Sequence, residues 1–115
     1  MDRIKDGVKS TFTSNVLTGL GSFGSLYDLK PILENYDHPV MVQSIDGVGT
    51  KTIIARKLGK FDTIGIDLLS AAANDILVMG AKPLTFLDYI ANDKLKPEIV
   101  EEIVSGMVKA CKETG

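Results

Sequence analysis

The sequence has 115 residues, of which 44% are hydrophobic and 24% charged, and its formal net charge is −2. A chain of this size builds one hydrophobic core, so we expect a single domain over residues 1–115. The apolar content excludes a disordered chain, and the absence of a basic excess argues against a nucleic-acid partner. One cysteine excludes an internal disulfide framework and favours a cytoplasmic location. No apolar run is long enough to span a bilayer, so no membrane partner is expected.

The first half of the chain predicts two helices and one strand. Residues 2–10 are typical of a short polar helix, and residues 15–29 are rich in Gly and Ser, which indicates a loop with a short extended piece. Residues 39–45 are apolar and β-branched between turn signals, which predicts a strand. A helix is expected over 50–58, and Gly59 stands where a helix C-cap is favoured.

The second half predicts two further strands that alternate with two helices. Residues 61–66 and 84–90 are predicted strands, and residues 68–79 a helix closed by Gly80. Residues 96–113 carry apolar side chains at helical spacing after a proline, which predicts a long helix. This alternation predicts an α+β fold, in which helices pack on one face of a mixed or antiparallel sheet.

The first candidate motif is Gly19–Gly24, which fits the pattern G-x-G-x-x-G. A dinucleotide-binding loop requires a following helix, and Pro31 leaves no room for one. Protein-kinase and Walker A loops are excluded because their companion residues are missing. The glycines would let backbone N–H groups approach an anion, and a flexible turn remains the alternative.

The second candidate motif is Ser44–Lys51, in which an acidic residue and two glycines precede a predicted helix. A helix that begins near Thr50 offers free N–H groups to a phosphate. Lys51 would add a positive charge, and Asp46 could bind Mg²⁺ through its hard oxygens. The alternative is an Asp-Gly turn followed by a Thr cap.

The third candidate motif places acidic and amide side chains on an otherwise apolar helix. Asp67 and Asn74 are seven residues apart, so on a helix they share one face within about 20°. Asp75 lies on the next row, and the small residues 71–73 allow another segment to approach closely. Helix capping by Asp67 and a solvated turn at Asp75 are the alternatives.

Three segments together resemble the phosphoribosylformylglycinamidine cyclo-ligase (AIR synthetase) family of purine biosynthesis. They are Asp46–Lys51, Asp62–Asp67 and Asn74–Tyr89, and the resemblance extends from Arg3 to the end of the sequence. Residues 75–83 fit the D-x₄-G-A-x-P signature of the ATP-using superfamily to which this family belongs.

The resemblance implies an ATP-dependent ring closure of formylglycinamidine ribonucleotide to aminoimidazole ribonucleotide. The family phosphorylates the amide oxygen of its substrate, and an internal nitrogen then attacks and expels phosphate. ATP and Mg²⁺ are the implied cofactors, and a homodimer is the implied assembly. Two alternatives stay open: a non-catalytic dimerisation module, and a superfamily relative with another phosphate acceptor.

Motif by motif, the resemblance also implies roles for individual residues. Asp46, Lys51 and Asp75 would be catalytic, and Asp46, Asp67 and Asp75 would surround the metal. The residues expected to bind the nucleotide are Lys5, Gly21, Ser22, Phe23, Gly24, Gly47, Gly49, Thr50, Asp67 and Asn74.

The sequence departs from the family pattern in two ways. Ser22 and Ser25 stand in a loop that is often richer in glycine. Family members are also considerably longer, with a G-G-E-T motif and a second domain following. We therefore interpret the sequence as the N-terminal ATP-binding domain of a larger enzyme and expect the isolated chain to lack ring-closing activity.

The predicted strands carry apolar side chains on more than one face. These residues are Val40, Val42, Ile64, Ile66, Phe86 and Leu87. One helical layer covers only one face of a sheet, so the other would expose a large apolar patch. A self-complementary interface would cover it, which independently predicts a homodimer.

Overall fold

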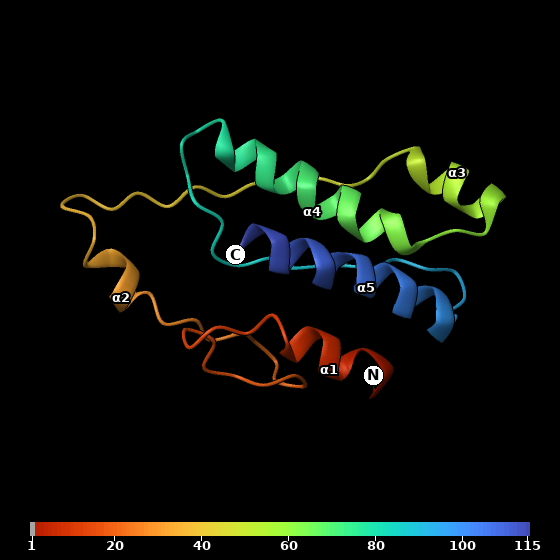
Figure 1. Ribbon diagram of the computed structural model, residues 1–115, viewed down its shortest axis with the longest axis horizontal. Coiled ribbons are helices and arrows are strands. Elements are labelled where there is room, and N and C mark those ends of the chain that lie inside the picture. Colours follow the sequence, from red (N-terminus) through yellow and green to blue (C-terminus); the bar gives the residue numbers. More distant parts are fainter. Residues whose placement is uncertain (1) are drawn as a thin grey trace. The chain divides into compact units, whose positions relative to one another are not determined.

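The computed structural model describes residues 2–115 and divides the chain into two compact units, Met1–Met41 and Val42–Gly115 (Figure 1). Its helices are, in chain order, α1 (Asp2–Lys9), α2 (Lys30–Leu33), α3 (Lys51–Leu58), α4 (Asp62–Leu77) and α5 (Pro97–Thr114). Among residues 2–115, no helix combines the length and apolar character needed to cross a membrane.

The first unit consists of α1, a loop and the short helix α2. The predicted extended piece in this loop is confirmed, because Val16 and Tyr27 form an isolated antiparallel bridge. Beside it, the Leu17 N–H donates a hydrogen bond of 2.9 Å to the Leu26 carbonyl oxygen. Residues 18–25, which include the whole first candidate motif, therefore form the turn that joins the two bridged segments.

The second unit contains α3, α4 and α5, and the sequence indicates three helices in this region. α3 ends where Gly59 adopts a left-handed conformation (φ 62°), as its position predicts. α5 begins at Pro97, where the missing N–H of proline costs no hydrogen bond. α4 stops at Leu77, and the Gly80 N–H (φ 75°) donates to the Leu77 carbonyl oxygen.

Two glycines allow α4 and α5 to pack backbone against backbone. A Cβ atom added to Gly65 would collide with the Ile103 carbonyl oxygen and lie 2.6 Å from the Met107 nitrogen. A Cβ atom on Gly106 would collide with the Asp62 carbonyl oxygen. The apolar side chains buried in this unit are Ala55, Ile64, Leu69, Val104, Met107 and Ala110. The α4–α5 contact, which contributes most of these side chains, is the core of the second unit.

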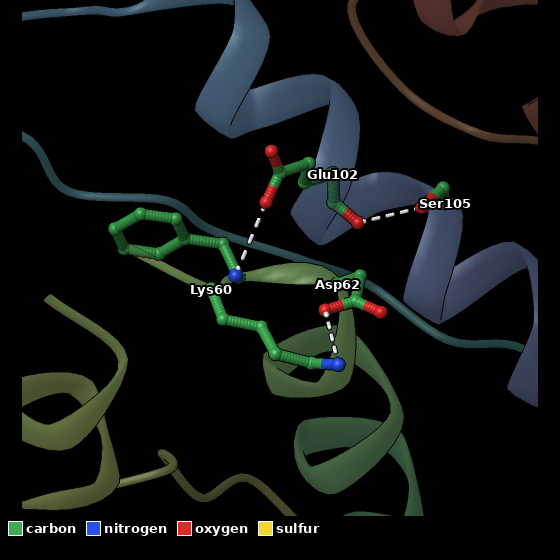
Figure 2. Close-up of polar contacts among 5 residues, drawn as sticks. Lys60, Asp62, Glu102 and Ser105 are labelled. Carbon is green, nitrogen blue, oxygen red and sulfur yellow. Dashed lines mark hydrogen bonds and ion pairs between the residues drawn. The ribbon is translucent and has the colours of Figure 1, made fainter. Parts of the chain in front are cut away.

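A side chain of α5 also supports the start of α4 (Figure 2). α4 has no side-chain cap of its own, but the Phe61 N–H donates a hydrogen bond of 3.1 Å to Glu102 Oε2. Lys60 Nζ lies 3.8 Å from Asp62 Oδ1 at the same helix end. Glu102 thus satisfies one of the backbone donors that a helix leaves unpaired at its N-terminus.

The predicted α+β fold is wrong, because residues 2–115 contain no β-strand and no sheet. Residues 61–66, expected as a strand, are the N-cap and first turns of α4, which begins six residues before the predicted helix at 68. Residues 39–45 and 84–90 have neither helix nor strand structure.

Tertiary packing explains this difference. Residues 61–66 are β-branched enough to favour a strand, yet helical geometry puts Ile64, Gly65 and Leu69 against α5. The segment that would have been the second of three strands is thereby removed. Residues 39–45 and 84–90 also form no ladder with each other in the part of the chain that the structure describes.

We predict that replacing Gly65 or Gly106 with Ala destabilises the chain by about 3 kcal/mol or more, because the added methyl group meets helix backbone rather than a movable side chain. Gly47→Ala is the control, since nothing lies within 4 Å of its added Cβ atom. Urea unfolding measures the stability of all three variants. Equal midpoints for the three variants would contradict the close packing of α4 and α5.

Candidate functional site

Residues 44–51, which we call the strap, lie along α4 and contact it at both ends (Figure 1). At one end, Ser44 Oγ donates a hydrogen bond of 2.8 Å to Asp75 Oδ2. At the other end, Lys51 Nζ lies 3.2 Å from Asp67 Oδ1. The strap therefore runs antiparallel to α4 and brings the second and third candidate motifs together.

The local sequence of the strap explains its turn. The Gly47 N–H donates a hydrogen bond of 2.7 Å to Asp46 Oδ1, and Gly49 has a φ of 60° that glycine adopts without strain. The Asp-Gly turn left open by the sequence is thus present. The side chain of Thr50 makes no capping hydrogen bond, so the predicted Thr cap is wrong. Instead, Thr52 Oγ1 donates a hydrogen bond of 3.0 Å to the Gly49 carbonyl oxygen.

α4 presents its polar residues as the spacing predicts. Asp67 and Asn74 both lie within the helix and therefore share a face. Helix capping by Asp67 is wrong, because α4 begins at Asp62. The small residues 71–73 are half-buried and lie between the two ends at which the strap is held.

The contacts of the strap lie at the surface. The side chains of Lys51 and Asp67 are 59% and 38% exposed, and both Ser44 and Asp75 are exposed. A surface ion pair contributes only about 0–1 kcal/mol to stability, because water screens it. The Lys51–Asp67 pair therefore contributes little to the stability of the fold.

The structure separates the carboxylates that are expected around a metal. In the part of the chain that the structure describes, no three His, Cys, Asp or Glu side chains are grouped so that they could hold a metal. Asp67 and Asp75 are eight residues apart on α4, which separates their backbone positions by about 12 Å along the helix. The metal-binding role of Asp46, Asp67 and Asp75 stays a prediction.

The remaining nucleotide-binding candidates belong to the first unit. Lys5 lies on α1, and Gly21, Ser22, Phe23 and Gly24 lie in the turn between the bridged segments. Gly21 has a φ of 98°, and the Phe23 side chain is fully exposed. The nucleotide-binding role of these residues stays a prediction.

Sequence reasoning assigned no role to Ser44, although the structure joins it to Asp75. The only signal was a hydroxyl group two residues before Asp46, inside the second motif. The partner is 31 residues away, so no local pattern identifies it. Ser44 occupies one oxygen of the Asp75 carboxylate and leaves the other free.

Two groups outside the strap have altered acidity. Burial raises the pKa of the Asp88 carboxyl, and a hydrogen bond from the Tyr89 backbone opposes this by lowering it. Burial also raises the pKa of the half-buried Cys111 thiol, which keeps it protonated and weakly nucleophilic. Neither residue was assigned a site role from the sequence.

The raised pKa of Asp88 predicts a pH-dependent effect on stability. Because the folded state disfavours the charged carboxylate, stability falls as the pH rises from the ordinary pKa of 3.8 through the raised value. We expect Asp88→Asn to raise the urea midpoint at pH 7 and to leave it unchanged at about pH 3. The exposed Asp93→Asn serves as control. A lower midpoint for Asp88→Asn at pH 7 would contradict this expectation.

Comparison with known protein families identifies the family to which the chain belongs. The model of the family "AIR synthase related protein, N-terminal domain" matches residues 31–115, and the chain belongs to this family. The resemblance inferred from the strap and α4 motifs is thereby confirmed.

Individual relatives are about 50% identical to this chain over the aligned residues. It is 54% identical over 111 residues to a phosphoribosylformylglycinamidine cyclo-ligase of Carboxydothermus hydrogenoformans, covering 96% of this chain and 32% of the relative. A protein of the same name from Thermoanaerobacter pseudethanolicus is 50% identical over 115 residues, covering 100% and 33%. A third, from Limosilactobacillus reuteri, is 49% identical over 113 residues, covering 98% and 32%. The chain spans about a third of the length of these curated relatives.

Proposed function

We propose that this chain supplies the N-terminal, ATP-binding part of a phosphoribosylformylglycinamidine cyclo-ligase that acts in cytoplasmic purine biosynthesis. Relatives that bear the name of that ligase align with nearly the whole of this chain. The observation that carries the proposal is the strap, because two segments far apart in sequence, both typical of the family, meet along one helix.

The strap and α4 suit the phosphoryl-transfer step of this ring closure. In that step the substrate's amide oxygen attacks the terminal phosphorus of ATP, and ADP leaves. Such a reaction depends on positioning and on neutralising phosphate charge. Lys51 offers a positive charge at the start of α3, and Gly47 and Gly49 leave open space through which a phosphate could approach the backbone.

Mg²⁺ bound to the triphosphate would supply further charge neutralisation. Of the three carboxylates first expected around it, Asp46 and Asp75 lie toward the same end of the strap, because Ser44 is two residues from Asp46 and bonds Asp75. One oxygen of each carboxylate is engaged with Gly47 or Ser44, which orients the group. These two residues are our candidates for catalysis at that end.

We predict that Asp46→Asn and Asp75→Asn each abolish ADP release by a cyclo-ligase that contains this chain, because an amide replaces an anionic ligand poorly. Circular dichroism should show unchanged helix content, since neither side chain is buried. Asp37→Asn, at an exposed loop position, is the control. Near-normal turnover in both variants would contradict the assignment.

We also propose that the chain assembles as a homodimer, which a second observation favours. Within the second unit, the segments that were expected to form strands expose large apolar side chains: Ile45, Leu87 and Tyr89 are each 82–97% exposed. Such groups destabilise a solvated surface, and soluble proteins cover large patches by association. A two-fold interface would cover two copies of the same segments at once.

We predict that light scattering at micromolar concentration reports at least twice the 12.4 kDa mass of the chain. Replacing Ile45 and Tyr89 with Ser should lower the measured mass, because both side chains are almost fully exposed and contribute little to the fold. The control replaces Leu20 and Phe12 with Ser, because these two side chains are less exposed. A monomer at every concentration would contradict the dimer.

A further inference from the structure

We propose that Asp67 is a positioning residue that holds the Lys51 ammonium group and is not a ligand of the metal. The inference rests on the proposed nucleotide site and refines it by dividing the strap into two ends. The Lys51 end would face phosphate charge, and any divalent cation would belong to the Ser44–Asp46–Asp75 end.

The observed ion pair is the first argument. Lys51 Nζ lies 3.2 Å from Asp67 Oδ1, so that oxygen is already engaged by a cation of the protein itself. An ammonium group has three donors, and one contact to Asp67 leaves others for an anionic ligand. A metal bound to the same carboxylate would place a second positive charge beside Lys51, which like-charge repulsion disfavours.

The length of α4 is the second argument. Asp67 and Asp75 are about 12 Å apart along the helix axis, and the strap spans the same interval between Lys51 and Ser44. An extended ligand such as a nucleoside triphosphate can reach both ends, whereas a single Mg²⁺ cannot.

The chain contains a matched control for removing the charge of Asp67. Asp62 also lies on α4, also pairs with a lysine, and has a similarly exposed side chain: Lys60 Nζ lies 3.8 Å from Asp62 Oδ1 (Figure 2). Asp62→Asn therefore removes one negative charge and one surface ion pair from the same helix without touching the strap.

The first experiment uses Mn²⁺ alone as the probe and measures its affinity by water-proton relaxation. We expect Asp75→Asn to weaken Mn²⁺ binding at least tenfold, and Asp67→Asn and Asp62→Asn to leave it within twofold of the unaltered chain. Equal weakening by Asp67→Asn and Asp75→Asn would overturn the proposal, because it would make Asp67 a ligand.

The second experiment measures ATP binding in EDTA, where no metal contributes. We expect Asp67→Asn to weaken ATP binding about threefold, Lys51→Met to weaken it more, and the double variant to match Lys51→Met. Tighter binding by Asp67→Asn, or an equal effect with and without Lys51, would overturn the proposal. Asp62→Asn should have no effect.

The two probes separate failure of this inference from failure of the proposed function. If the unaltered chain binds ATP but no Mn²⁺, the proposed metal end is wrong and the ATP cycle alone decides the role of Asp67. If it binds Mn²⁺ but no ATP, the proposed ATP-binding function is wrong, and the Mn²⁺ comparison alone decides whether Asp67 is a metal ligand. Binding of neither probe would overturn the proposed function and this inference together.

Discussion

The close approach of α4 and α5 at Gly65 and Gly106 is the constraint on which the second unit depends. Because no side chain separates the two backbones there, Met107 and Val104 can bury against one face of α4. Asp67 and Asn74 lie roughly 180–200° around the helix from Gly65, on the opposite face. One face of α4 thus supplies the core, and the other is left for the strap.

Much of the helical structure could be predicted from local signals. Pro97, Gly59 and the apolar spacing of α5 mark helix ends and faces that the structure reproduces. The absence of a sheet among the described residues could not be predicted from local signals. Residues 61–66 are helical where Gly65 packs against the backbone of Ile103 and Met107, and these contacts join positions about 40 residues apart.

The candidate site likewise has features that the sequence predicts and features that only the folded chain reveals. Glycine and aspartate chemistry predicted the turn at Asp46 and Gly47, and helical spacing predicted the shared face of Asp67 and Asn74. The two contacts that join strap to helix, Ser44 with Asp75 and Lys51 with Asp67, required the folded chain. Family motifs named most of these residues, but only the folded chain shows that Asp67 and Asp75 contact opposite ends of the strap.

The small core of the second unit has a thermodynamic consequence. No polar or charged side chain is buried among the described residues, and no large side chain there is completely shielded from water. Any molecule that binds only the folded chain adds its binding free energy to the free energy of unfolding. The melting temperature of this chain consequently has a definite meaning only when the concentration of that molecule, or of the chain itself, is stated.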